Sequence, residues 1–242
     1  MNETVRGGLL AFMNELLLLV TALISALFVV VGWRLGRLYA VIILFLILIA
    51  GVGGKIVEFF GHSTNTGNIF YASVFLATYF LIERYGKREG IRSIWVGIIG
   101  VLFFSALAWI TIALIGSPAT APLNEALSIA FGPVPRVAFA SLVAYAISQS
   151  LNVYLYLLFK KRLQGKYLWL RANICNATAQ IVDGLIFFTI AFVGVASTSV
   201  TIDAIFMGLA IKVVYMMFAA PLLYLNKIEE ERAKGAWAIT LK

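Results

Sequence analysis

Seven stretches of this chain are apolar and long enough to cross a lipid bilayer, and this feature limits the fold more than any other. A helix needs about 20 apolar residues to span the hydrocarbon core of a bilayer. Only 12% of the residues are charged, whereas about a quarter are charged in a typical soluble domain. The sequence therefore predicts an all-α, polytopic membrane helix bundle with about seven transmembrane helices. Their approximate ranges are 10–32, 38–57, 67–84, 93–116, 134–159, 170–195 and 202–225.

The basic residues predict how these helices are oriented. Every second connection is rich in Lys and Arg, and together with the C-terminal tail these connections hold 15 of the 19 basic residues. The alternate connections hold only Arg6, Lys55 and Arg136. Because cytoplasmic loops carry an excess of Lys and Arg, we expect the N-terminus outside and the C-terminus in the cytoplasm. The net charge of +8 then reflects this bias and contact with anionic lipid, and does not indicate nucleic-acid binding.

Several classes of function are disfavoured by what the sequence lacks. Cys175 and His62 are its only cysteine and histidine, which excludes an intrachain disulfide, a cysteine metal site and a histidine metal cluster. The chain has no Walker A motif, no glycine-rich dinucleotide loop and no HExxH motif. No activated nucleophile with a base is recognisable. We therefore expect neither an enzyme nor a bound cofactor or metal, and no ATP hydrolysis by this chain alone.

The sixth apolar stretch, with the segment Trp169–Phe192, carries polar side chains on one face. At about 100° per residue, Asn173, Asn176, Gln180 and Asp183 fall within an arc of roughly 80°. Ionisable groups at membrane depth are costly and commonly mark a pathway or a binding site. Asn and Gln can also hold helices together through hydrogen bonds. Because four polar groups end here in a carboxylate, we favour a binding site.

The first stretch begins without the basic segment and cleavage site of a signal peptide, and we expect it to be retained.

The fifth stretch repeats this pattern. Ser141, Tyr145, Ser148 and Asn152 follow one helical face, and Gln149 lies beside them. Small and amide side chains there suit close helix packing as well as contact with a ligand. We favour a site role for Gln149 and Asn152, and leave packing and ligand contact as equal alternatives for Ser141 and Ser148.

A lysine lies deep in the last stretch. Lys212 is about ten residues into it, and a buried lysine needs a counter-charge or loses its proton. Since Asp183 is the other deep ionisable group of opposite charge, we predict that the two lie close together across the bundle. Tyr215, about one helical turn from Lys212, is a candidate to join them.

Two further charges lie near the ends of apolar stretches. Lys55 comes late in the second stretch and has three candidate roles, namely a local pair with Glu58, a position at the outer interface, or a site role. Glu83 ends the third stretch beside the cations at 84, 87 and 88. Spacing alone favours a cytoplasmic interfacial ion pair between Glu83 and these neighbours.

Amides, one carboxylate, a nearby cation and aromatic rings together favour a pocket for a neutral, planar solute with many hydrogen-bonding groups. A carboxylate can accept two N–H groups of a guanine-like edge, and Asn and Gln supply both donors and acceptors. An ion channel would more commonly show a ring of charges or a filter loop. Stacking on the solute could come from the aromatic residues Phe70, Tyr71, Tyr79 and Tyr145.

Three segments resemble the queuosine precursor transporter family, also called the vitamin uptake transporter family. They are GNIFYASVFLATYFLIERYGKREGIRSIWVG, FGPVPRVAFASLVAYAISQSLNVYLY and LWLRANICNATAQIVDGLIFFTIAF. NELLLL and GGKIVEFFG also resemble one branch, so the resemblance covers nearly the whole chain. It implies a family core at about 38–226, preceded by an extra N-terminal helix at about 10–32, in a single domain over residues 1–242.

The resemblance also implies a set of functional residues and a substrate. The family pattern falls on Arg171, Asn173, Gln180, Asp183, Lys55, Glu83, Tyr85, Gly86, Lys212, Ser148 and Gln149. It implies import of a 7-deazaguanine precursor of queuosine or archaeosine across the cytoplasmic membrane. Members usually carry Asp where this chain has Tyr79, and many carry Asp in place of Asn152. These two changes imply an altered substrate preference or the loss of a group that carries a coupling proton.

The sequence thus predicts a multi-pass importer in the cell membrane for a small planar heterocycle of the 7-deazaguanine type. The alternative is a substrate-binding subunit for another vitamin or nucleobase that works with a separate ATP-driven module. A homo-oligomer or an energising partner fits either case. The candidate substrate-binding residues are Asp183, Gln180, Asn173, Asn176, Gln149, Asn152, Ser148, Tyr145, Lys212, Arg171, Glu83, Lys55 and Tyr79.

Overall fold

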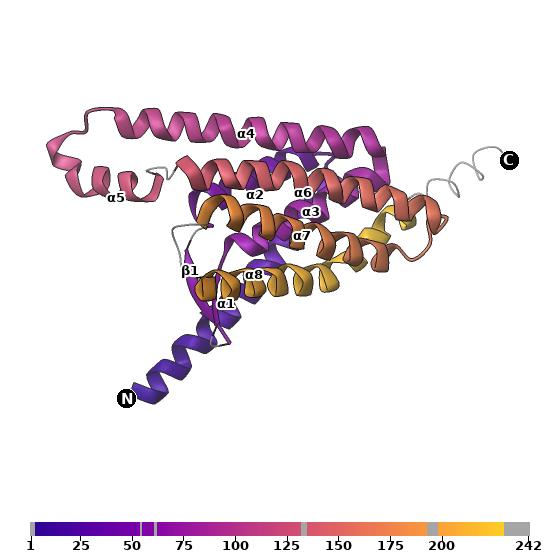
Figure 1. Cartoon of the computed structure of the whole chain (residues 1–242), viewed down its shortest axis with the longest axis horizontal. Helices are drawn as coiled ribbons and strands as arrows, with labels where there is room; N and C mark the ends of the chain where they lie inside the picture. Colours follow the sequence, from indigo (N-terminus) through magenta and orange to yellow (C-terminus); the bar gives the residue numbers. More distant parts are fainter. Residues whose placement is uncertain (1–2, 54, 61, 132–134, 193–197, 230–242) are drawn as a thin grey trace.

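The computed structural model describes residues 3–53, 55–60, 62–131, 135–192 and 198–229. Within these ranges the side chains of residues 3–11, 63, 135–138, 188, 191–192 and 198–204 are not described. The described part is almost entirely helical (Figure 1). Its helices are α1 (Glu3–Arg34), α2 (Leu38–Gly51), α3 (Gly67–Tyr85), α4 (Lys87–Ala113), α5 (Ala121–Phe131), α6 (Pro135–Arg162), α7 (Leu168–Phe192) and α8 (Thr198–Ala219), with short 3₁₀ turns η1 (Pro118–Thr120) and η2 (Ala220–Leu223).

Each of the seven predicted stretches corresponds to one helix, and α5 is an additional one. The prediction treated the segment that contains α5 as a connection, but the structure folds it into a helix that turns back beside the end of α4 (Figure 1). Among the described residues, four helical segments are long and apolar enough to cross a membrane. The four are Phe12–Arg34, Lys87–Ala113, Phe139–Arg162 and Ile205–Glu229.

The second helix is shorter than predicted. α2 ends at Gly51, and the chain then forms an antiparallel hairpin of β1 (Ile56–Phe59) and β2 (His62–Asn65). At Gly53 the backbone lies so close to the preceding turn that an added Cβ would be 2.6 Å from the carbonyl oxygen of Ile49. The glycine-rich segment therefore lets the chain leave the helix, and Lys55 follows the helix instead of lying within it.

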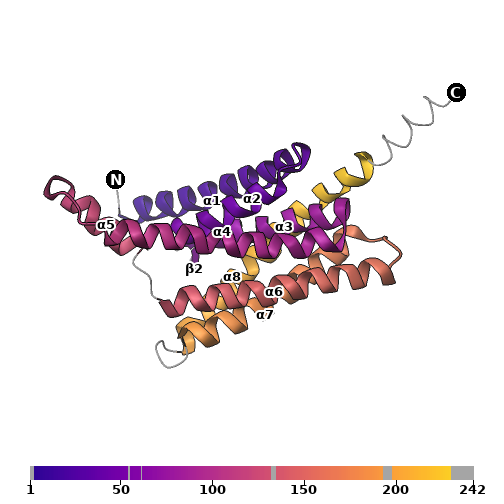
Figure 2. The same cartoon turned by 90° about the horizontal axis from the view of Figure 1, so that it is seen from above.

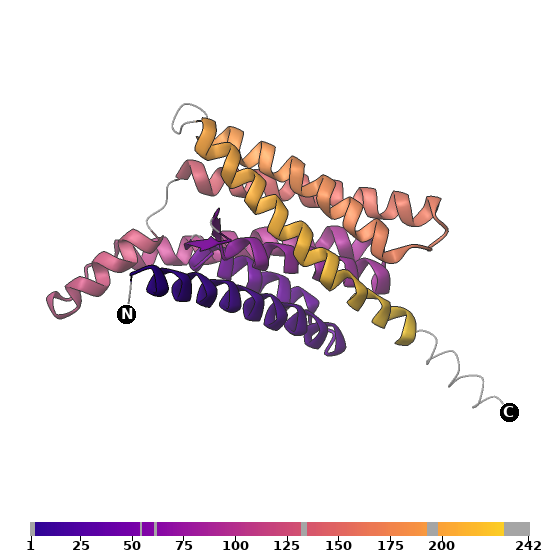
Figure 3. The same cartoon turned by 90° about the horizontal axis from the view of Figure 1, so that it is seen from below.

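α3 is the central helix of the bundle. It packs against α1, α2, α4, α6 and α8, and nearly every residue from Gly67 to Ile82 is buried. Figure 2 shows α3 between the α1–α2 pair and the α6–α7 pair, and Figure 3 shows α8 crossing the bundle obliquely. A helix buried on all sides carries no amphipathic pattern, which explains why its central place was not apparent from the sequence.

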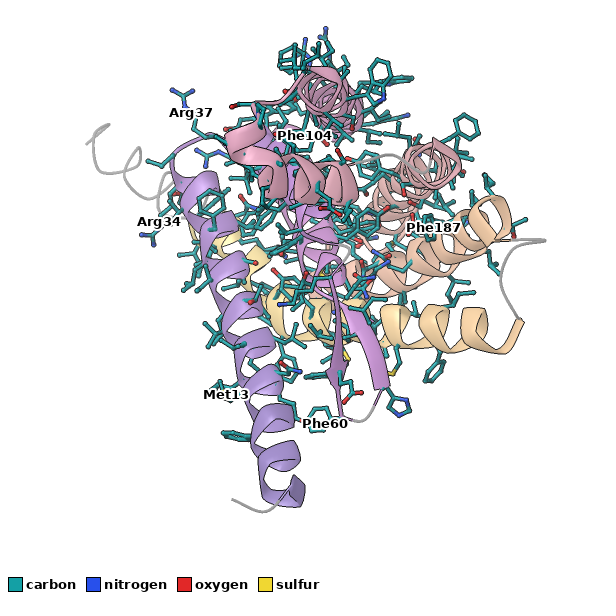
Figure 4. All side chains as sticks on the ribbon, turned by 90° about the vertical axis from the view of Figure 1, so that its left-hand side faces the viewer. Met13, Arg34, Arg37, Phe60, Phe104 and Phe187 are labelled. Atoms are coloured by element: carbon teal, nitrogen blue, oxygen red, sulfur yellow. The ribbon has the colours of Figure 1, made fainter. Side chains whose placement is uncertain are left out.

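The connections rich in basic residues lie at one end of the bundle. The turns α1–α2, α3–α4 and α6–α7 lie at the same end, while the start of the chain and the α4–α5 connection lie at the other (Figure 2). Gly86 joins α3 to α4 with φ +84°, a conformation that favours glycine. Figure 4 shows Arg34 and Arg37 at one end of α1, with Met13 and Phe60 toward the other.

This arrangement separates the described basic turns from the opposite end of the bundle, and which end faces the cytoplasm stays a prediction. Five basic residues of that prediction, Arg6, Arg136, Arg232, Lys234 and Lys242, lie outside the described side chains. The outward face of α4 is apolar, with Trp95, Phe103 and Trp109 exposed. Exposed apolar side chains along a long helix are expected where the surrounding solvent is lipid.

Candidate functional site

The polar face predicted on α7 is buried inside the bundle. Asn176, Gln180 and Asp183 are 0%, 2% and 9% exposed, and Asn173 is partly buried. α7 packs against α6 and α8, which enclose this face. We refer to Asn173, Asn176 and Gln180 as the amide ladder, because they lie on the successive turns of α7 that precede Asp183.

Asp183 and Lys212 form the predicted ion pair. Lys212 Nζ on α8 lies 3.6 Å from Asp183 Oδ2 and 4.7 Å from the centre of the Tyr71 ring. The other carboxylate oxygen, Asp183 Oδ1, accepts hydrogen bonds from the Tyr71 hydroxyl at 2.7 Å and from Ser148 Oγ at 3.0 Å. Both oxygens of Asp183 are therefore engaged by groups of the protein. Tyr215, the further candidate, instead accepts a hydrogen bond of 2.7 Å from Ser73.

The amide ladder carries polar atoms that have no hydrogen-bond partner within the described part of the chain. These atoms are both polar atoms of the Gln180 side chain, together with Asn173 Oδ1 and Asn176 Oδ1. The amide nitrogen of Asn173 donates to Trp169 O at 2.8 Å, and that of Asn176 donates to Lys212 O at 3.5 Å. Since a carbonyl can only accept, these two contacts fix which amide atom remains unpaired.

The unpaired set is thus three carbonyl oxygens and one NH₂ group. A buried polar atom without a partner costs on the order of 1–3 kcal/mol, and native proteins contain few such atoms. Four of them on consecutive turns of one helix, next to a buried ion pair, indicate a place where a hydrogen-bonding ligand can be held.

A second polar group joins α3 and α6 and is fully paired. Gln149 Nε2 lies 3.3 Å from Thr78 Oγ1, and Gln149 Oε1 accepts from Asn152 Nδ2 at 3.1 Å. Asn152 Oδ1 accepts from the Tyr79 hydroxyl at 2.6 Å. Gln149 and Asn152 are therefore buried as expected, but they bond to each other and to α3. On the same face of α6, Tyr145 is also buried, with its ring edge-on to Tyr71 at 6.1 Å, whereas Ser141 is exposed.

A third polar group lies at the end of the bundle that holds the basic turns. Glu83 accepts a 2.6 Å hydrogen bond from Arg171 Nη2 and another of 3.2 Å from Lys160 Nζ. Arg171 is fully buried and lies against the Tyr156 ring, which stacks in turn on Tyr79 with centroids 4.5 Å apart. Glu83 thus joins α3 to α6 and α7.

The predicted pairing of Glu83 with its sequence neighbours is wrong. Arg84 forms its ion pair with Glu229 at 3.4 Å and lies against the Trp33 ring. Consecutive residues of a helix point in different directions, so Glu83 faces the bundle interior while Arg84 faces the segment after α8. For Lys55, the structure gives an exposed side chain that does not contact Asp183, Lys212 or the amide ladder.

Sequence reasoning missed three residues that connect these groups. Tyr71 was considered only for stacking, yet it donates a hydrogen bond to Asp183. Thr78 and Tyr156 were not singled out, although they bond to Gln149 and Arg171 respectively. The available signal was the run of hydroxyl residues within the apolar sequence of α3, where Tyr71, Ser73 and Thr78 occur.

Comparison with known proteins now places this chain in a family. The family described as "Putative vitamin uptake transporter" matches residues 65–226, a range that contains Asp183, Lys212, the amide ladder and Glu83. The chain belongs to the vitamin uptake transporter family. It is also 34% identical over 179 residues to the "Probable queuosine precursor transporter" of Bacillus subtilis (strain 168), which covers 72% of this chain and 76% of that protein.

This member of the vitamin uptake transporter family is accordingly a multi-pass membrane transporter and not an enzyme. No solved structure matches the chain. The family match begins at Asn65, after the second helix, so Lys55 lies outside it.

Proposed function

We propose that this transporter imports a 7-deazaguanine precursor of queuosine and holds it against the amide ladder of α7. The observation that carries the proposal is the unpaired Gln180 amide, which is 2% exposed and lies one turn from Asp183. The name of the Bacillus subtilis relative supports the same class of solute. We further propose that seven helices, all except α5, span the membrane with the N-terminus outside.

The unpaired atoms suit the edge of such a base. A 7-deazaguanine offers N–H donors at its amide, its exocyclic amine and its pyrrole nitrogen, and an acceptor at its carbonyl oxygen. The ladder offers three carbonyl oxygens and one NH₂ group. A ligand rich in donors that also accepts one bond would satisfy all of them, which removes the cost of burying them unpaired.

The other candidate residues then have supporting roles. Asp183 holds Tyr71, Ser148 and Lys212 beside the ligand, because its oxygens are already engaged. Tyr145 supports the Tyr71 ring from its edge. Three polar groups inside the bundle follow from this assignment. They are the ladder with Asp183 and Lys212, the neutral group of Tyr79, Asn152, Gln149 and Thr78, and the charged group of Glu83, Arg171 and Lys160. We assign no ligand contact to Lys55.

Ligand binding to the purified chain in detergent tests the proposal. A thermal-shift measurement would compare 7-deazaguanine precursors with guanine and adenine. We expect a rise in melting temperature with the deazaguanines in the native protein and none in Gln180→Met, which keeps the side-chain shape but removes both polar atoms. Equal stabilisation of the two proteins would exclude Gln180 from the site. Uptake by liposomes that contain only this chain would show whether an energising partner is needed.

A further inference from the structure

The acidic residues around the amide ladder are few, and the described ones are paired. The four helices α3, α6, α7 and α8 contain three acidic residues, Glu83, Asp183 and Asp203, and the side chain of Asp203 lies outside the described residues. Asp183 is paired with Lys212, and Glu83 with Arg171 and Lys160. The unpaired polar atoms of the ladder are all neutral amide atoms, and the other unpaired atom described on α7, Arg171 Nε, belongs to a cation.

Lys212 lies alongside α7 from Asn176 to Asp183. Its backbone carbonyl accepts from Asn176, while its ammonium group lies beside Asp183. Asn176 and Asp183 are two turns apart on α7, about 10 Å along the axis. The lysine side chain therefore spans the turn of α7 that carries Gln180, and the ammonium group is held there by Asp183 and by the Tyr71 ring.

A ligand with its own positive charge would meet an unfavourable environment at this ladder. Its cation would lose hydration on entering the bundle, which is costly unless an anion replaces the lost water. Asp183 cannot replace that water without releasing Lys212, and two cations at close range repel strongly where the dielectric is low. The neighbouring polar group of α3 and α6, formed by Tyr79, Asn152 and Gln149, is neutral as well.

We propose that Lys212 sets the charge selectivity of this site, so that it accepts neutral planar bases and excludes bases that carry a protonated amine. The proposal rests on the proposed function, since it concerns the same ladder. It goes further because it distinguishes among 7-deazaguanines by the charge of the substituent on the five-membered ring. Lys212 acts as the specificity-determining residue, and Asp183 keeps its ammonium group in position.

Two ligands with the same ring test the proposal. The purified full-length protein would be measured with 7-cyano-7-deazaguanine, which is neutral, and with 7-aminomethyl-7-deazaguanine, which is protonated at pH 7. We expect the neutral compound to bind at least about tenfold more tightly. Equal affinities, or a preference for the amine, would overturn charge selectivity and leave the proposed function intact. Failure of both compounds to bind would instead reject the proposed function.

Variants then assign the selectivity to Lys212. In Lys212→Met, Asp183 loses its counter-charge, and we expect the preference to shift toward the amine by about tenfold or more. Lys227→Met is the matched control, because Lys227 also lies against a tyrosine ring, that of Tyr224, but after α8. If both variants keep the native preference, Lys212 does not set it. Should Lys212→Met fail to fold, the neutral double variant Asp183→Asn with Lys212→Met removes the same repulsion, so the preference for the cyano compound is expected to fall below that of the native protein. An unchanged preference in the double variant would overturn the role of Lys212.

Discussion

Tyr79 on α3 donates a hydrogen bond of 2.6 Å to Asn152 on α6, so the two positions at which the family resemblance implied acidic residues are in direct contact. Two carboxylates facing each other there would repel unless one were protonated. The neutral pair instead ties α3 to α6, and the Tyr79 hydroxyl also lies 3.1 Å from Ala172 O on α7. Tyr79 and Asn152 therefore form one contact between three helices.

Removing the hydroxyl of Tyr79 tests how much this contact stabilises the bundle. Tyr79→Phe keeps the stack on Tyr156, leaves Asn152 Oδ1 without its donor and removes the additional contact to Ala172 O. We expect a loss of about 1–2 kcal/mol in the free energy of unfolding. Thermal unfolding in detergent measures the change, and Tyr154→Phe is the control because Tyr154 is 60% exposed. Equal effects of the two variants would show that the contact contributes little.

Replacement by methionine should lower the stability of the protein at one buried glutamine, Gln149, but not at another, Gln180. Gln149→Met breaks bonds to Thr78 and Asn152 and is expected to cost about 1–3 kcal/mol of stability. Gln180→Met removes two unpaired atoms, so we expect unchanged or higher stability together with loss of ligand binding. Melting temperature and base binding, measured on both variants, check this. A marked loss of stability in Gln180→Met would mean that its amide is paired in the folded protein.

Asp183 and Lys212 should be strongly coupled. Asp183→Asn leaves a buried ammonium group without its counter-charge, and breaking a buried pair commonly costs about 3–5 kcal/mol. The double variant with Lys212→Met should lose less than the sum of the two single changes, by more than about 1 kcal/mol. A double-mutant cycle of unfolding free energies measures the coupling. Normal base uptake by Asp183→Asn would rule out a role for Asp183 in transport.

Glu83 should contribute far more to the stability of the fold than Glu229, although both bind an arginine. The Glu83 pair with Arg171 is 8% and 0% exposed, whereas the side chain of Glu229 is 51% exposed. Glu83→Gln is expected to destabilise the bundle by about 3 kcal/mol or more, and Glu229→Gln by less than about 1 kcal/mol. Melting curves at low and high salt separate the two cases, because salt screens only the exposed pair effectively.

The proposed orientation can be tested by cysteine labelling. Cys175 is the single cysteine and is buried, so Cys175→Ala gives a cysteine-free background. We expect Thr120→Cys, in η1, to react with a membrane-impermeant maleimide on intact cells. Gln164→Cys, in the α6–α7 turn, should react only after permeabilisation. Labelling of Gln164→Cys in intact cells would reverse the assigned orientation.

The sequence by itself determined the features that depend on local pattern. Apolar length located the helices and the family resemblance located the transporter class, because both are properties of consecutive residues. The α7 face followed from helical periodicity. The Asp183–Lys212 pair followed from charge balance, since a deep lysine requires an anion and the sequence offers few.

Only the tertiary structure decided which polar groups bind each other and which remain unpaired. Glu83 turned to Arg171 and Lys160 instead of to its sequence neighbours, and Tyr71 was brought to Asp183 from a helix that shows no polar face. Gln149 and Gln180 have the same side chain and are both buried, yet one is paired and the other is not. That difference depends on which helix packs opposite each residue, and a one-dimensional pattern does not contain that information.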